Sequence, residues 1–230
     1  MGQLLTRRSV VAAGLAAPLL CLPGCATRLG DLVNFEDAIR RILTLSSQRA
    51  FARLLTEEGF FRDDLARVTL PPQLGGSRVA SVLAVALGTR AVQDRLLRLV
   101  NAAAAEGARA AAPIVYNSIR EMSIADALSI VRGGPNAATS YLQRSMGDRI
   151  VDVMFPGVGN ALRVLDNGIV NRAVQVATGI DFQTVQADVS QKAAAGIYRA
   201  IGREEAAIRA DPQATGDPVL AGVFGLAGRR

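Results

Sequence analysis

Apolar residues recur along most of this chain with the 3.6-residue period of amphipathic helices. A long helix is predicted over residues 182–209, and a second from Phe35 to a stop at Gly59. A third is predicted after Thr89 as its N-cap. The predicted apolar face of the 182–209 helix consists of Val185, Val189, Ala193, Ile197, Ile201 and Ile208.

Shorter helices are predicted between these segments. A short buried helix is expected over residues 77–87, and residues 123–126 resemble a capping box before another helix. Pro113 is expected to begin a new helix at its first turn. A further helix is predicted over 137–155, closed by Pro156 and Gly157. With no internal repeat and no long linker, the pattern predicts an all-α, single-domain multi-helix bundle over residues 35–230.

The N-terminus has the three parts of an export signal. Arg7 and Arg8 form a basic segment, an apolar stretch follows over residues 10–22, and Gly24 precedes Cys25. At about 13 residues, this stretch is shorter than the roughly 20 that a membrane-spanning helix needs. Residues 1–24 are therefore predicted to be a cleaved signal peptide, exported by either the twin-arginine or the general secretory route.

Cys25 ends the tetrapeptide Leu-Pro-Gly-Cys, which resembles the lipobox of bacterial prolipoproteins. We expect lipidation of Cys25, a tether over residues 25–34, and an outer-membrane lipoprotein facing the periplasm. Ala26, rather than Asp, after the cysteine favours the outer membrane in hosts with the enteric sorting rule. The alternative is cleavage after Ala26, which would give a soluble periplasmic protein.

Composition narrows the chemistry. The chain has no histidine, and its only other cysteine, Cys21, lies within the predicted signal. Histidine-based catalysis and thiolate or imidazole metal sites are thereby excluded, and we predict no cofactor and no metal site. The net charge of +6 comes from arginines interspersed with acids, with Lys192 as the only lysine. This pattern is typical of solvated helix surfaces, not of a nucleic-acid interface.

The candidate ligand site follows a glycine-rich turn. Gly133 and Gly134 precede the helix predicted from residue 137, and a helix N-terminus can bind an anion with Thr139 nearby. Tyr141 and Arg144 follow at helical spacing and could contact a lipid headgroup. The alternative is a helix–helix turn in which glycine supplies a positive φ, followed by a packed tyrosine and a solvated arginine.

Several stretches resemble an uncharacterised bacterial family, domain of unknown function 4197. They are Leu70-Pro71-Pro72, residues 101–104 through 113–114, residues 122–127 through 133–134 to 137–142, and Glu204-Glu205 through residues 208–212 to 220–225. The resemblance implies an exported, mainly helical protein, often a lipoprotein. It implies no activity, ligand or catalytic residue.

Together these features favour a binding or structural module at the cell envelope, with a lipid or a protein partner. The alternative is a soluble periplasmic hydrolase that uses carboxylates, which a paired, buried Asp or Glu would support. Asp148 and Asp152 share a predicted helix face, which is typical of surface charge. Ser190 lies near Lys192 but lacks the spacing of a known Ser-Lys catalytic motif. The sequence does not indicate an oligomeric state.

Overall fold

The computed structural model describes residues 34–70, 89–125, 127–163 and 181–227. Residues 33–230 form a compact unit of their own. The predicted signal peptide, Cys25 and the helix predicted over 77–87 lie outside the described residues.

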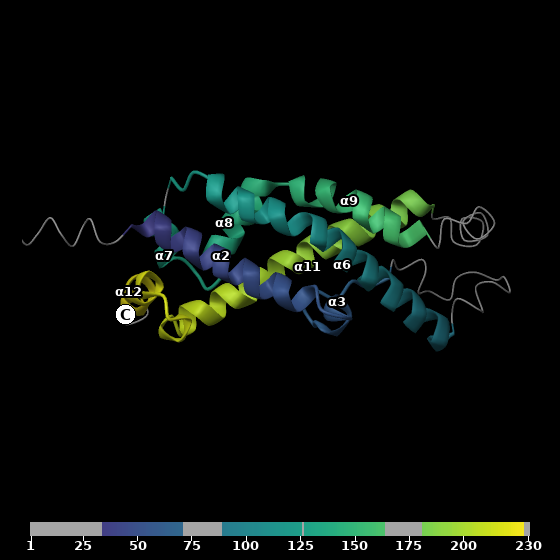
Figure 1. Cartoon of the computed structure of the whole chain (residues 1–230), viewed down its shortest axis with the longest axis horizontal. Helices are drawn as coiled ribbons and strands as arrows, with labels where there is room; N and C mark the ends of the chain where they lie inside the picture. The colour runs from purple at the N-terminus through teal and green to yellow at the C-terminus, as the bar shows by residue number, and fades with distance from the viewer. Residues whose placement is uncertain (1–33, 71–88, 126, 164–180, 228–230) are drawn as a thin grey trace, which may run out of the picture. The chain divides into compact units, whose positions relative to one another are not determined.

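The described part of the chain is all-α, as the hydrophobic pattern predicts (Figure 1). It contains no strand, and its core is a single cluster of mostly small apolar side chains. Its elements are α2 (Phe35–Leu54), α3 (Gly59–Arg62), α6 (Arg90–Glu121), α7 (Ala127–Arg132), α8 (Ala137–Met146), α9 (Arg149–Leu162), α11 (Phe182–Ala210), the 3₁₀-helix η2 (Gln213–Thr215) and α12 (Pro218–Ala227).

Helix α11 lies at the centre of the bundle, against α2, α6, α8 and α9. The prediction for this helix is confirmed, since all six residues of its predicted apolar face are buried. Asp181 begins the helix, and its side chain accepts a hydrogen bond from the backbone N–H of Thr184. Asp211 ends it, directly before Pro212. Polar residues of α11 therefore reach several neighbouring helices at once.

Helix α6 contradicts the prediction that Pro113 begins a new helix. It runs without a break from Arg90 to Glu121, with Pro113 in its interior. An interior proline removes one backbone hydrogen bond and costs about 3 kcal/mol. Ala111, Ala112 and Val115 are buried on either side of it. We attribute the continuity to this burial, because packing of both turns against the bundle offsets the local cost.

The prediction of a single helix over residues 137–155 is also wrong, because two helices, α8 and α9, occupy this range. Gly147 separates α8 from α9 with a φ of +53°, which glycine adopts without steric cost. Pro156 and Gly157 do not end α9 but lie within it. A Cβ at Gly157 would lie 3.2 Å from the Cα of Gly107. The glycine thus serves a close backbone contact between α9 and α6.

The C-terminal end of α6 is fixed by a side chain from α2. Arg40 donates hydrogen bonds from Nη1 to the carbonyl oxygens of Ile119 (2.7 Å) and Arg120 (2.8 Å), and from Nη2 to that of Met122 (2.6 Å). These carbonyl groups lie at the C-terminal end of α6, where no backbone N–H group further along the helix can donate to them. One guanidinium therefore joins α2 to the end of α6.

None of the helices in the described ranges is long and apolar enough to cross a membrane.

Candidate functional site

The N-terminus of α8, the predicted anion site, receives a carboxylate from the protein itself. Glu205 of α11 is fully buried and accepts hydrogen bonds from the backbone N–H of Ala138 (3.0 Å) and of Thr139 (2.7 Å). The Thr139 hydroxyl donates a third bond, also of 2.7 Å. A carboxylate is favourable here because unpaired N–H groups and the helix dipole converge at this end.

Arg209 completes the surroundings of Glu205. Its Nε donates to the carboxylate at 2.8 Å, and its other nitrogens donate to the carbonyl oxygens of Val131 (2.9 Å) and Ile130 (3.1 Å). The guanidinium also stacks on the ring of Phe224 at 4.7 Å. This cluster joins α7, α8, α11 and α12, so its role is structural.

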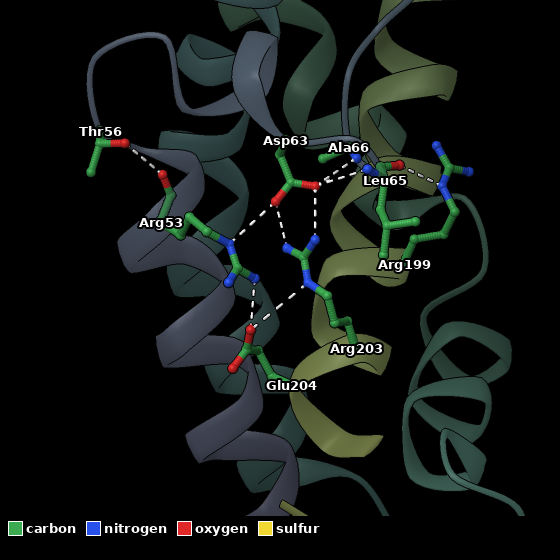
Figure 2. Close-up of polar contacts among 8 residues, drawn as sticks. All are labelled: Arg53, Thr56, Asp63, Leu65, Ala66, Arg199, Arg203 and Glu204. Carbon is green, nitrogen blue, oxygen red and sulfur yellow. Dashed lines mark hydrogen bonds and ion pairs between the residues drawn. The ribbon is translucent and has the colours of Figure 1, made fainter. Parts of the chain in front are cut away.

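A second ionic cluster lies one turn earlier on α11 (Figure 2). Asp63, only 3 % exposed, accepts hydrogen bonds from both terminal nitrogens of Arg203 and forms an ion pair with Nε of Arg53 at 3.2 Å. The backbone N–H groups of Leu65 and Ala66 donate to it as well. Burial alone would raise the pKa of Asp63, but the hydrogen bonds from Arg203 and the backbone outweigh it and lower the pKa.

Glu204 is the other carboxylate of this cluster. Arg53 donates to it at 2.6 Å, whereas Nε of Arg203 is 4.0 Å away and makes no hydrogen bond. Asp63 and Glu204 thus come from different elements and share two arginines. The hydrolase alternative predicts a pair of buried acids, but here only Asp63 is buried and Glu204 is partly exposed. The lowered pKa of Asp63 also makes it a poor proton donor at neutral pH.

A cavity of about 390 Å³ opens between α8 and α11, beside both clusters. Among the described residues, the charged ones that line it are Arg199 and Arg203, and none is an acid. Arg199 is exposed and donates from Nε to the carbonyl oxygen of Leu65 at 2.7 Å. The other lining residues are Leu65, Pro135, Asn136, Thr139, Ser140, Gln143, Ala195, Tyr198, Gly202 and Ala206.

Tyr198 brings an unpaired donor to the wall of this cavity. The residue is 5 % exposed, and its buried hydroxyl has no hydrogen-bond partner within the described part of the chain. Burial raises the pKa of Tyr198 to about 12, so the hydroxyl stays protonated at any physiological pH. A protonated phenol without an acceptor is uncommon in a folded protein and calls for an explanation.

Two further cavities on the described surface differ from this one in charge. One of about 480 Å³ lies between α6 and α9 and is lined by Glu106. The other, of about 430 Å³, lies between α2 and α12 and has lining residues of both charges, Arg40 and Arg41 with Asp37 and Asp217. Among these three cavities, the one between α8 and α11 alone has cationic and no anionic lining side chains.

Of the residues predicted to bind a ligand, Thr139 lines the α8–α11 cavity. Gly133 and Gly134 lie in the exposed turn before α8, Arg144 is exposed, and the Tyr141 hydroxyl donates to the carbonyl oxygen of Ser123. These four residues do not line the cavity.

The expectation that the Gly133-Gly134 turn needs a positive φ is wrong, because neither glycine has one. A Cβ at Gly133 would instead lie 2.7 Å from that of Ala137, so the site requires glycine for space.

The sequence analysis missed Tyr198, Arg199 and Arg203, which supply the cavity wall from α11. Their only signal in the sequence is the four-residue spacing of the two arginines, which places them on one helix face. Arg49 and Arg53 share that spacing without lining this cavity, so the spacing alone does not identify the site. Only the packing of α11 against α8 distinguishes Arg199 and Arg203.

The remaining sequence candidates do not form a reactive group. Lys192 donates to Asp188 (2.7 Å) and to the carbonyl oxygen of Thr69 (3.1 Å), and the buried Ser190 hydroxyl makes no hydrogen bond. Asp148 and Asp152 are exposed. No group of three or more acidic, cysteine or histidine side chains able to hold a metal occurs among the residues that the structure describes.

Comparison with known proteins places the chain in one family. Residues 32–225 match the family model described as "Protein of unknown function (DUF4197)", so the chain belongs to that family. No curated protein and no solved structure matches it.

Proposed function

We propose that this member of the DUF4197 family is a cell-envelope lipoprotein, held by a lipid at Cys25, whose helical domain binds a ligand in the α8–α11 cavity without chemistry. The anchor rests on the lipobox resemblance of residues 22–25 and on the short apolar segment before it. Lipidation gives firm attachment because each buried methylene contributes about 0.8 kcal/mol and lipoproteins carry more than one chain.

The observation that carries the binding role is the composition of the cavity wall. It combines two arginines with hydroxyl and amide side chains, and contains no acid, histidine or cysteine. Such groups orient a ligand by hydrogen bonds and charge but include no general base of suitable pKa at neutral pH. The neighbouring carboxylates of Asp63 and Glu205 are already bound by arginine and backbone donors. Recognition is therefore better supported than hydrolysis.

The cavity also favours one kind of occupant over another. The small residues Gly107 and Gly157 serve a close contact between helices, not a cavity. The α8–α11 cavity combines apolar lining residues, Leu65, Pro135, Ala195 and Ala206, with its arginines, hydroxyls and amides. The polar groups favour a headgroup or a polar segment of an envelope protein, and the apolar residues pack against its carbon skeleton.

The anchor is tested by a Cys25→Ser variant in the native host. We expect the variant to lose lipid labelling and to keep its signal, because the lipoprotein peptidase requires a lipidated cysteine. A variant that still fractionates with membranes at the mobility of the mature protein would contradict the anchor.

The binding role is tested by native mass spectrometry of the protein purified from its own host. We expect a bound small molecule or a stoichiometric partner, lost when Ala195→Leu fills the cavity wall. Ala195 is half-buried and has no polar role, so the variant changes volume and leaves charge unchanged. Ala161→Leu, in the α6–α9 cavity, is the matched control. An empty wild-type protein, or a ligand that persists in Ala195→Leu, refutes the proposed site.

A further inference from the structure

We infer that the ligand of the α8–α11 cavity carries a carboxylate or phosphate group, and that Arg199 binds this anion. The inference rests on the proposed function and adds the chemical class of the ligand. It follows from the charge of the cavity wall, from the hydrogen bond of Arg199 and from the polar side chains that line the cavity from α8.

No carboxylate in the described part of the chain pairs with Arg199. Of the two arginines in the wall, Arg203 is paired with Asp63, whereas the hydrogen-bond partner of Arg199 is the neutral carbonyl of Leu65. The two acids between the lining residues Arg203 and Ala206 are likewise bound to other groups: Glu204 to Arg53, and Glu205 to Arg209 and the N-terminus of α8. The wall therefore has a net positive charge centred on Arg199.

The hydrogen bond from Arg199 Nε fixes the guanidinium and leaves its terminal nitrogens available. Figure 2 shows the group joined to the Leu65 carbonyl through Nε alone, with no dashed contact at either terminal nitrogen. These two nitrogens form one edge of the planar fork that binds carboxylate or phosphate through two parallel hydrogen bonds. A preorganised guanidinium loses less conformational entropy on binding than a free one.

The surrounding groups also suit an acceptor-rich ligand. Ser140 and Gln143 line the cavity from α8, opposite Arg199, and each can donate to an oxygen. The Tyr198 hydroxyl and Arg203 Nε also lack a hydrogen-bond partner in the described residues, but both atoms are buried, so a ligand in the cavity reaches neither. A cation would instead meet two guanidinium groups, and a neutral apolar group would leave Arg199 without a partner charge.

The size of the cavity sets a further limit on the ligand. A volume of about 390 Å³ lies near the lower end of the range of about 300–1,000 Å³ for small-molecule pockets. It admits a small organic anion or one lipid headgroup. The small organic anion and the lipid headgroup share an anionic group, and the experiment therefore tests binding of that group alone.

The test is an NMR titration of the ¹⁵N-labelled protein with inorganic phosphate and, separately, with acetate at low ionic strength. We expect saturable shifts at the backbone amides of α8 and α11 around Ser140 and Arg199. Arg199→Gln should weaken binding at least tenfold, which corresponds to about 1.4 kcal/mol. Arg144→Gln removes the same charge from an exposed position of α8 outside the cavity, and should change the affinity less than twofold.

A second variant keeps the test valid if Arg199→Gln disturbs the local fold. Gln143→Glu places a negative charge in the wall at an exposed position. It should abolish phosphate and acetate binding while leaving the thermal midpoint within a few degrees of the wild-type value.

Vesicle binding then identifies the source of the anion. Phosphatidylcholine vesicles with and without phosphatidylglycerol are compared for wild type and Arg199→Gln. A loss of binding to the anionic vesicles in the variant indicates a lipid headgroup. Phosphate binding that depends on Arg199, without such a loss, indicates a soluble anion.

The inference is overturned if wild type binds neither probe, or if Arg199→Gln and Arg144→Gln bind both equally well. It is also overturned if mass spectrometry finds a neutral ligand that Ala195→Leu displaces, a result that leaves the proposed binding function intact. Failure of the binding function gives a different result, an empty protein or a ligand that persists in Ala195→Leu.

Discussion

Replacing Glu205 with alanine is expected to lower the free energy of unfolding by about 3–5 kcal/mol, the usual cost of removing one member of a buried ion pair. Glu205 is fully buried and accepts bonds from two backbone N–H groups, from the Thr139 hydroxyl and from Arg209. The hydroxyl can rotate towards another acceptor, whereas the two N–H groups and Arg209 Nε cannot.

The magnitude follows from these three donors. Each buried donor left without an acceptor costs about 1–3 kcal/mol, so even the low end of that range gives about 3 kcal/mol. That is a large share of a total stability of about 5–15 kcal/mol. Glu205→Gln retains one acceptor oxygen and should therefore lose less than Glu205→Ala.

Urea denaturation followed by circular dichroism provides the measurement, with stability compared at an unchanged m-value. Glu106→Ala is the control, because Glu106 and Arg109 also form an ion pair within one helix but are 52 % and 51 % exposed. The control should lose less than about 1 kcal/mol. If Glu205→Ala loses no more than Glu106→Ala, Glu205 does not hold the N-terminus of α8.

Three further predictions concern single positions. Burial favours the protonated form of Asp63, but the hydrogen bonds to its carboxylate outweigh burial and lower its pKa. The ionised carboxylate therefore adds its full stability above the unfolded pKa of about 4, and this stability is lost as the pH falls below that value. The stability difference between wild type and Asp63→Asn should accordingly shrink in urea titrations below pH 4, and a constant difference would contradict the assigned ion pair. Tyr198→Phe removes a buried hydroxyl without a partner and should leave the thermal midpoint unchanged or raised, whereas a clear drop would reveal a hidden acceptor. Gly107→Ala should cost about 1–3 kcal/mol, because its Cβ would lie 2.8 Å from the side chain of Val158, whereas Gly222→Ala meets nothing within 4 Å and should not destabilise; equal effects would refute the close contact.

The long helices were predictable because their burial is one-sided and sustained. In α11 the apolar face runs from Val185 to Ile208, Asp181 is a favourable N-cap, and Pro212 follows directly after the C-cap. Helix α2 likewise begins at Phe35, after Asn34 as its N-cap, although it ends at Leu54 rather than continuing to Gly59. Periodicity and local caps are properties of the segment itself, so the sequence contains them.

The errors share a different cause. Pro113, Pro156 and Gly157 act as helix breakers when judged locally, yet each lies inside a helix that packs against the bundle. The contact between Gly157 and Gly107 joins residues 50 positions apart. A local rule cannot include the free energy of such a contact, so tertiary packing overrides it.

The candidate site was predictable only where its residues follow from a local signal. The residues around α8 were found because a glycine turn before a helix is a local signal, and Thr139 lines the cavity. The pairing of Glu205 with the N-terminus of α8 joins residues 66 positions apart. The role of Arg199 likewise depends on the position of the Leu65 carbonyl. Neither could be inferred before the helices were placed.

The bonds that Arg40 makes to the last turn of α6 restrict how this sequence can change over evolutionary time. A guanidinium presents five N–H donors in a planar fork, whereas the ammonium of lysine donates from one atom. In a genome whose base composition favours lysine, an exposed arginine such as Arg109 can be exchanged at little cost. At position 40 the same exchange would leave some of three carbonyl groups without a donor. Lysine-rich members of the family are therefore expected to retain arginine here, so part of the arginine content of this chain reflects geometry and not codon usage.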